Sequence, residues 1–398
     1  MKEGWIEKTL GDACNIARGG SPRPIQAFLT DAADGVNWVK ISDATASGKF
    51  IYVTKEKIKP SGVSRSRVVN PGDFLLSNSM SFGRPYIMQT TGCIHDGWLV
   101  LSDYEKDFNQ GFLYHLLGSP VVFEQFDRLA AGSTVRNLNI ELASRVSIPI
   151  PPLPEQQRIV ALLDEAFDGI ATAKANAEKN LQNARAIFES HLQSVFINGG
   201  ANWSDTVIGK CIRFIDYRGK TPEKTSNGLK LITAKNVRMG YLKNTPEEFV
   251  APESYDSWMT RGIPKCGDVL FTTEAPLANV AQLMTDEKVV FAQRIIVMQA
   301  DAAKLDSTFL KYMLLSSPIQ QRIHEKGTGA TVQGIKASLL KLIEISFPDS
   351  IAEQRQIVAK LDALNAETQR LESIYQQKLT ALDELKKSLL HQAFSGAL

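Results

Sequence analysis

The sequence has 398 residues, 43% hydrophobic and 22% charged, a composition typical of a folded globular protein and not of a disordered chain. This length is enough for two ordinary domains, each with its own hydrophobic core. No stretch approaches the roughly 18 consecutive apolar residues of a membrane-spanning helix, and the N-terminal MKEGWIEKTLGD lacks the apolar run of a secretory signal, so we expect a cytoplasmic protein.

Residues 1–150 are predicted to form a mixed α+β domain. Short β-branched or aromatic runs, NWVKIS, KFIYVT and GDFLLS, are separated by Gly, Pro and Asp, which is typical of strands. The segment FNQGFLYHLLGSPVVFEQFDRLA is predicted to be helical, with an interruption at Pro120. Between residues 55 and 67 five basic side chains oppose only Glu56, so this stretch can follow a phosphate backbone or simply form a solvated face.

Residues 151–200 are predicted to form one long helix that opens near Pro154. An apolar stripe, rich in alanine, follows the helical period; its members are Ile159, Leu163, Ala166, Ile170, Ala173, Ala177, Ala184 and Phe188. A helix of about 40 residues is about 60 Å long. With an apolar stripe along that length, the helix requires a partner.

Residues 201–348 are predicted to form a second α+β domain. LKLITA, GDVLFT and VVFAQRIIVMQ are typical of strands, and DSTFLKYMLLSSPIQQRIHEK of helices interrupted at Pro318. From Lys210 to Lys243 nine basic residues oppose two acidic ones. The net charge of +2 therefore conceals a local basic excess in each domain, with +1 over residues 1–150 and +4 over 201–348.

Residues 349–398 are predicted to form a second long helix, with Ser350 and Glu353 as a capping box. Its stripe follows steps of three and four residues, as in a coiled coil: Leu361, Leu364, Thr368, Leu371, Tyr375, Lys378, Leu382, Leu385 and Leu389.

The second half of the chain repeats the first. EQQRIVALLD at Glu155 matches EQRQIVAKLD at Glu353, a shift of 198 residues, and Trp5 falls on Trp203 at the same shift. PGDFLLS meets KCGDVLFT, FLYHLLGSP meets FLKYMLLSSP, and AGSTV meets TGATV, in one order along the chain. We interpret the chain as a duplication. Because the ends of a domain usually lie close together, the second long helix is expected to run antiparallel to the first, with the two domains related by a pseudo-twofold axis.

The sequence carries no recognised catalytic signature. Phosphate loop, dinucleotide fingerprint, nucleophile elbow, H-E-x-x-H and N-P-P-[YF] segments are absent, the five histidines are scattered, and the four cysteines contain no C-x-x-C pair. We therefore expect no catalytic residue, bound cofactor or metal on this chain.

Two similar domains at a fixed separation suit a ligand with two sites of its own, as duplex DNA offers. Because the two domains differ in most loop residues, we expect an asymmetric, split DNA target with an unread gap. The alternative is a scaffold or adaptor whose two domains bind protein or peptide, and a third possibility is a hidden nuclease or methyltransferase.

These features resemble the specificity subunits of type I restriction-modification systems. The resemblance covers the whole chain and is carried by IPIPPLPEQQRIV, its repeat ISFPDSIAEQRQIV without the double proline, and the ending LLHQAFSGAL. It implies a target-recognition domain over residues 1–150, a central spacer helix over 151–200, a second target-recognition domain over 201–348 and a C-terminal spacer helix over 349–398, with the helices as an antiparallel coiled coil.

The resemblance further implies a non-catalytic, DNA-binding subunit that recognises a bipartite target. Its helices would space the half-sites and dock two methyltransferase subunits, which bind S-adenosylmethionine and methylate adenine. Restriction subunits that translocate and cleave DNA would join the same complex.

Candidate base-reading residues are polar side chains expected on loops. In the first domain these are Lys40, Ser42, Arg65, Arg67, Ser77, Asn78, Arg84, Thr134 and Arg136; in the second they are Lys230, Lys235, Asn236, Arg238, Thr272, Thr273, Thr331 and Lys336. Gly132–Thr134 and Gly329–Thr331 are candidates for backbone contacts to phosphate, or ordinary turns. Arg84→Ala is expected to weaken binding to the first half-site by roughly 1–3 kcal/mol.

Overall fold

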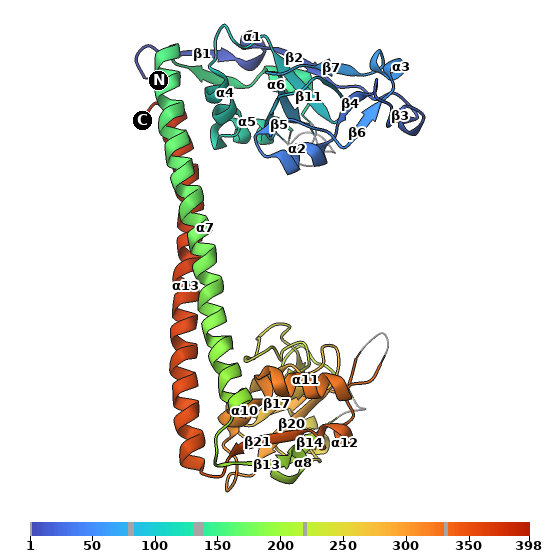
Figure 1. Ribbon diagram of the computed structural model, residues 1–398, viewed down its shortest axis with the longest axis vertical. Coiled ribbons are helices and arrows are strands. Elements are labelled where there is room, and N and C mark those ends of the chain that lie inside the picture. Colours follow the sequence, from blue (N-terminus) through green and yellow to red (C-terminus); the bar gives the residue numbers. More distant parts are fainter. Residues whose placement is uncertain (1, 79–82, 131–137, 218–220, 330–332) are drawn as a thin grey trace. The chain divides into compact units, whose positions relative to one another are not determined.

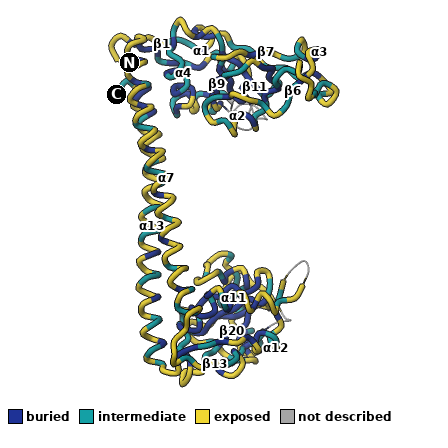
Figure 2. Tube along the Cα trace, in the orientation of Figure 1, coloured by how far each residue is buried: buried dark blue, intermediate teal, exposed yellow. Residues whose placement is uncertain are grey.

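The computed structural model describes residues 2–78, 83–130, 138–217, 221–329 and 333–398 (Figure 1). The chain folds into two compact units, one made of Met1–Glu178 with Gln377–Leu398 and the other of Lys179–Gln376. Each unit contains one α+β domain and parts of both long helices. Figure 2 shows that buried residues concentrate inside the two domains, whereas the helices are largely exposed or half-buried.

The domain of the first unit contains three sheets. β1 (Ile6–Thr9) pairs with β12 (Ser147–Ile150), and the other two sheets have the orders β3-β6-β4-β10-β7 and β2-β11-β8-β9-β5. Their strands are β2 (Asn15–Arg18), β3 (Leu29–Thr30), β4 (Val36–Val39), β5 (Phe50–Ile51), β6 (Glu56–Ile58), β7 (Arg67–Val69), β8 (Phe74–Ser77), β9 (Pro85–Met88), β10 (Gly92–Ile94) and β11 (Trp98–Ser102). The helices are α1 (Leu10–Ala13), α2 (Ile41–Ser47), α3 (Pro60–Val63), α4 (Gln110–Leu117), α5 (Pro120–Ala130) and α6 (Ile140–Ser144), with a 3₁₀ turn at Ile25–Ala27.

The domain of the second unit repeats this scaffold with fewer strands. β13 (Trp203–Val207) pairs with β21 (Glu344–Pro348), and the other sheets have the orders β14-β20-β17-β18 and β16-β15-β19. Their strands are β14 (Ile212–Asp216), β15 (Leu229–Ile232), β16 (Phe249–Val250), β17 (Val269–Thr272), β18 (Val280–Gln282), β19 (Val289–Phe291) and β20 (Ile295–Ala300). The helices are α8 (Ile208–Cys211), α9 (Tyr255–Trp258), α10 (Ser307–Leu315), α11 (Ser317–Lys326) and α12 (Ala337–Leu340), with a 3₁₀ turn at Pro252–Ser254.

Equivalent residues confirm the duplication at the level of backbone geometry. Gly72 and Gly267 both have positive φ, of 99° and 92°, at the turn before the strand of the repeated GD segment. The aspartate after each glycine closes that turn, since Asp73 Oδ2 accepts from Asn70 N at 2.7 Å and Asp268 Oδ2 accepts from Lys265 N at 2.8 Å. The repeated sequence therefore encodes one turn, used twice.

Most predicted elements are confirmed, with small corrections. NWVKIS ends as a strand at Val39, and α2 begins at Ile41, where Asp43 accepts from the Lys40 backbone N–H. VVFAQRIIVMQ forms two strands, β19 and β20, because the chain breaks between them at Ala292–Arg294, where Arg294 has a φ of 77°. Pro120 and Pro318 lie in the first turns of α5 and α11, as their missing N–H groups require.

The long helices are α7 (Leu153–Asn198) and α13 (Ile351–Ser395). In the first unit the Lys386 ammonium of α13 lies over the Phe167 ring of α7, 4.8 Å from its centroid. Further along α7, Lys174 forms an ion pair with Asp383 at 2.7 Å. In the second unit Arg185 pairs with Glu372 at 2.8 Å, and Leu192 packs near Leu361. Partner numbers fall as α7 numbers rise, so the helices are antiparallel within each unit.

All eight residues of the α7 stripe are buried or half-buried, as predicted. The α13 stripe needs two corrections: Lys378 is exposed and Leu379 is half-buried in its place, and Leu385 is 46% exposed. The polar Thr368 is only 7% exposed and belongs to the stripe as predicted. The burial pattern departs from the predicted steps only at these two positions, since Leu382 and Leu389 are half-buried as predicted.

Candidate nucleic-acid interface

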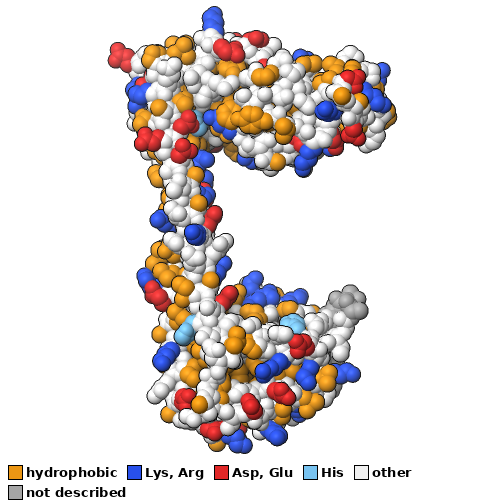
Figure 3. All heavy atoms as spheres, in the orientation of Figure 1, with side chains coloured by type: hydrophobic (Ala, Val, Ile, Leu, Met, Phe, Trp, Pro, Cys, Tyr) orange, Lys and Arg blue, Asp and Glu red, His pale blue; other side chains and the backbone are white. Residues whose placement is uncertain are grey.

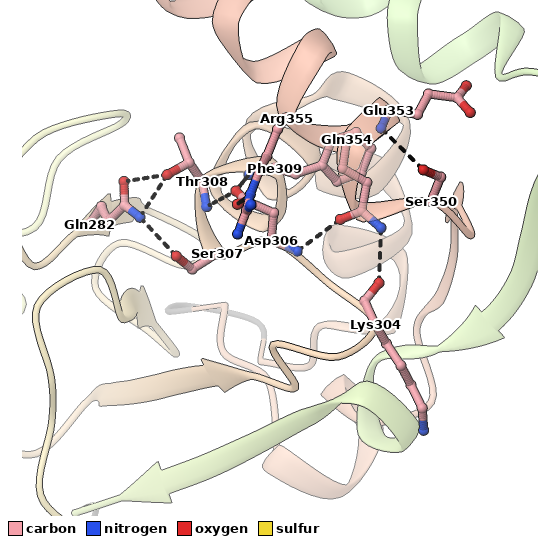
Figure 4. Close-up of polar contacts among 10 residues, drawn as sticks. All are labelled: Gln282, Lys304, Asp306, Ser307, Thr308, Phe309, Ser350, Glu353, Gln354 and Arg355. Carbon is pink, nitrogen blue, oxygen red and sulfur yellow. Dashed lines mark hydrogen bonds and ion pairs between the residues drawn. The ribbon is translucent and has the colours of Figure 1, made fainter.

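A buried glutamine fixes the start of each long helix to the domain that precedes it. Gln354 accepts from the Asp306 backbone N–H at 2.8 Å and donates to the Lys304 carbonyl at 2.9 Å (Figure 4). It also donates to the Pro348 carbonyl at 2.7 Å. Gln156 forms the same three bonds in the first unit, to Asn109 N, Asp107 O and Pro151 O, at 2.8 to 2.9 Å.

These bonds give the repeated EQ motif a physical role. Both glutamine side chains are fully buried, and each holds the N-cap residue of a domain helix, Asn109 of α4 or Asp306 of α10. The caps are then completed by side-chain oxygens, since Asp306 accepts from two N–H groups of α10 (Figure 4). The Ser350 hydroxyl accepts from Glu353 N at 3.4 Å, which confirms that half of the predicted capping box.

About two helical turns further along each long helix, a second repeated contact has different chemistry in the two copies. His115 Nε2 lies 2.7 Å from Asp164 Oδ1 in the first unit, whereas the Tyr312 hydroxyl donates to Asp362 at 2.5 Å in the second. Burial lowers the pKa of His115 below its ordinary value, against the raising effect of Asp164 and with a smaller lowering from Lys49 and Lys386. Burial and the Asp362 carboxylate raise the pKa of Tyr312.

The far end of each long helix packs against the domain of the other copy. Phe394, near the end of α13, lies 5.3 Å from Phe112 in the core of the first unit, with their rings nearly perpendicular. Phe196, near the end of α7, lies 5.3 Å from Phe309 in the second unit. Each domain therefore contacts the start of one helix and the end of the other.

The exposed or half-buried candidate residues of the first domain lie in three places. Lys40 and Ser42, at the start of α2, line a cavity of about 1050 Å³. Arg65 stacks its guanidinium 5.5 Å from the Phe28 ring, and Arg67 donates from Nε to the Arg18 carbonyl at 2.8 Å. The Arg84 guanidinium lies over the Tyr86 ring, 5.4 Å from its centroid. Arg84 also lines a separate groove of about 840 Å³ beside the last turns of α13.

In the second domain the exposed or half-buried candidates are also dispersed. Lys235 lines a smaller cavity of about 180 Å³, and Lys230 donates to Asn244 Oδ1 at 3.2 Å. The half-buried Arg238 lies on a loop whose backbone bonds to Tyr241, and the exposed Lys336 precedes α12.

Five of the candidates are buried, and their known partners lie within the protein. They are Ser77, Asn78, Asn236, Thr272 and Thr273, none more than 3% exposed. Asn236 accepts from Thr233 and donates to the Lys243 and Pro246 carbonyls, and the Thr272 hydroxyl donates to Pro276 O at 2.6 Å. These side chains are buried at strand ends or in the adjoining loops, so in this arrangement they are not exposed to a ligand. Thr134, Arg136 and Thr331 lie outside the described residues, as does most of the two predicted phosphate-contacting turns.

Residue patterns missed several polar groups that line the two cavities. Arg23, His95 and Asp96 join Lys40 in the first cavity, and Lys224, Glu248 and Arg294 join Lys235 in the second. A sequence signal was available, because RGGSP at Arg18 recurs as RGKTP 200 residues later. Ser21 of the first segment lines the first cavity, and Thr221 of the second segment lines the second cavity.

Among the described residues, no cluster of three or more potential metal ligands occurs, and no helix is long and apolar enough to cross a membrane. Lys and Arg side chains lie among Asp and Glu on the visible faces of both domains, and hydrophobic side chains reach the surface of the long helices (Figure 3). Exposed large apolar residues on these helices are Leu153, Leu162, Ile187, Ile197, Ile374 and Leu385.

Comparison with known proteins agrees with this architecture. The type I restriction modification DNA specificity domain matches residues 2–182 and 219–381. The type I restriction enzyme MjaVIII specificity subunit of Methanocaldococcus jannaschii is 21% identical over 423 residues, covering 100% of this chain and 94% of the relative. The EcoKI specificity subunit of Escherichia coli K12 is also 21% identical, over 429 residues, covering 100% of this chain and 90% of the relative.

Solved structures show the same fold. A chain from a structure that addresses complex assembly and conformational transition in the type I R-M system superposes with a TM-score of 0.80 at 21% identity, covering 100% of this chain and 99% of that one. The HsdS subunit from Thermoanaerobacter tengcongensis superposes with a TM-score of 0.63 at 20% identity, covering 100% and 98%. The resemblance identified from the sequence is confirmed: this chain belongs to the family of type I restriction-modification DNA specificity subunits and carries the family's domain twice.

Proposed function

We propose that this chain selects the DNA target of a type I restriction-modification complex by binding an asymmetric sequence of two half-sites separated by an unread gap. The observation that carries the proposal is one scaffold used twice with different polar surfaces. The repeated sheets, helix caps and glutamine contacts coincide, whereas equivalent positions after the central strand carry different side chains, such as Ser42 and Lys235. Two domains of this kind suit two different half-sites.

The chain directs catalysis without performing it. Two methyltransferase subunits bind S-adenosylmethionine and methylate adenine, and restriction subunits join the same complex. The cofactor is expected on the methyltransferase subunits and not on this chain. Support for docking comes from the long helices, where apolar side chains such as Ile187 and Ile374 are 58% and 42% exposed outside the contact between α7 and α13. Exposed apolar side chains of this kind favour protein partners.

The direct test is to co-express the full chain with the methyltransferase encoded beside it and to map N6-methyladenine across the host DNA. A split, asymmetric motif that disappears when this chain is omitted is the expected result. A stable complex without any chain-dependent motif would refute the proposal and favour the adaptor.

Salt dependence separates DNA binding from the adaptor alternative. Each phosphate neutralised by Lys or Arg releases counterions, so the logarithm of affinity should fall linearly with the logarithm of salt concentration, by about 0.9 per contact. A peptide-binding adaptor has no reason to lose DNA affinity in this way. Incubating the purified chain alone with DNA and magnesium, or with DNA and S-adenosylmethionine, tests for catalysis and should leave the DNA unchanged.

A further inference from the structure

The two domains each contain a cavity at the same place in the repeated scaffold. The first cavity, of about 1050 Å³, is lined by Ser21–Gln26, Leu29, Trp38, Lys40–Ser42, Glu56, His95 and Asp96. The second cavity, of about 180 Å³, is lined by Thr221, Lys224, Thr233–Lys235, Glu248, Ala275 and Ala292–Arg294. Each set comes from segments far apart in the sequence but within one unit.

Strand register establishes the equivalence. Trp38 of β4 is the pairing partner of Glu56 and lies beside Cys93 of β10. In the second domain Leu231 of β15 donates its N–H to the Glu248 carbonyl at 2.8 Å and lies beside Val290 of β19.

The residues that follow these strands therefore correspond one to one. After the central strand, Lys40 corresponds to Thr233 and Ser42 to Lys235. After the neighbouring parallel strand, His95 corresponds to Ala292. Glu56 and Glu248 are equivalent and line the two cavities, whereas the residues at the other three equivalent positions differ in chemistry.

Both cavities carry cation–carboxylate pairs. In the first, Arg23 pairs with Asp96 at 3.2 Å and Lys40 with Glu56 at 2.5 Å. In the second, Lys224 pairs with Glu248 at 2.9 Å. A site for phosphate alone would present cations without carboxylates, because like charges repel. Donors and acceptors together match the edges of bases, where a carboxylate can accept from the amino group of cytosine.

We propose that each cavity is the base-reading site of its domain and takes the groove edge of one DNA half-site, with Ser42 and His95 determining the first half-site and Lys235 the second. The proposal rests on the proposed function, because it assigns to these cavities the recognition described above. It also explains the different half-sites, since the groups at equivalent positions differ in charge and hydrogen-bonding capacity.

The His95 side chain can donate a hydrogen bond to a DNA base. Its Nδ1 accepts from the Gly97 N–H at 2.9 Å, so the neutral ring carries its proton on Nε2, on which no hydrogen bond to a described residue is recorded. Burial lowers the pKa of His95, so the neutral form persists at pH 7. An N–H donor at this position suits an acceptor such as O6 or N7 of guanine. Ala292 supplies no such donor in the second cavity.

The test uses the full chain with its methyltransferase and reads both half-sites separately. The variants are His95→Ala and Ser42→Lys in the first cavity, Lys235→Ser in the second, and Lys106→Ala as an exposed control in the first domain outside the cavities. Methylation motifs are mapped, and binding is measured on duplexes in which one half-site at a time is randomised.

First-cavity variants should relax or change bases of the first half-site only, with roughly 5- to 150-fold weaker binding, the range expected for losing a base contact. Lys235→Ser should change only the second half-site, and Lys106→Ala neither. A wild-type motif that all three cavity variants retain, at unchanged affinity, would overturn the inference while leaving the proposed function intact. Equal losses at both half-sites would overturn it as well, and absence of any chain-dependent motif would overturn the proposed function together with the inference.

Discussion

Replacing Gln354 by methionine should release α13 from the second domain at low steric cost. Methionine is unbranched and of similar length, so the fully buried site stays filled while all three hydrogen bonds are lost. A buried hydrogen bond contributes about 1 kcal/mol net, and leaving buried backbone groups unpaired adds to the cost. The free energy of unfolding of the second unit should therefore fall by about 3 kcal/mol.

The assay is chemical denaturation of the full chain, followed by intrinsic fluorescence, with Gln356→Met as the matched control. Gln356 is exposed and lies only two residues away on the same helix, so its replacement should cost less than about 0.5 kcal/mol. For a unit of about 200 residues, a loss of 3 kcal/mol corresponds to a decrease in Tm of roughly 6–12 °C.

The same change at Gln156 provides an independent repetition, because its three bonds are equivalent and belong to the first unit. If Gln354→Met and Gln156→Met both unfolded within 0.5 kcal/mol of the Gln356→Met control, the repeated EQ motif would not be the anchor that the geometry indicates.

Three further outcomes follow from the repeated contacts. Burial holds the pKa of His115 below its unfolded value of about 6.5, so the unfolded chain binds more protons as pH falls; the stability from this group is full above that pH and declines as pH drops through the folded pKa. His115→Tyr, which introduces the residue of the second copy, should flatten this decline in urea titrations at pH 5 and 7. An unchanged pH dependence in the variant would exclude His115 as the source of the decline. Phe394→Ala should destabilise the first unit by about 3–5 kcal/mol, since the ring is buried in that core. A loss below 1 kcal/mol in denaturant titrations would show that the end of α13 does not stabilise the core of the first unit. Asp383→Ala removes an exposed ion pair and should change stability by less than about 1 kcal/mol at 0.15 M salt; a larger change in the same titrations would contradict its assignment as a surface pair.

The antiparallel pairing of α7 and α13 was predictable because it depends on local and repeated information. A 3.6-residue apolar period indicates a long amphipathic helix wherever it occurs, and the 198-residue shift between Gln156 and Gln354 shows that one unit was copied. The α13 stripe was less predictable at one point. Lys378 fits the step of three, but the half-buried side chain is that of Leu379, because burial is set by packing and not by spacing alone.

The sequence by itself determined the duplication, the α+β class, the two long helices and, through the repeated motifs, the family. It did not determine which polar side chains face a ligand. Asn78 and Thr272 have the chemistry of DNA contacts, yet both are buried, whereas His95, which was predicted only to be one of several scattered histidines, lines the first cavity. Exposure depends on strand pairing between segments dozens of residues apart, so only the tertiary structure could bring His95, Lys40 and Arg23 to one cavity.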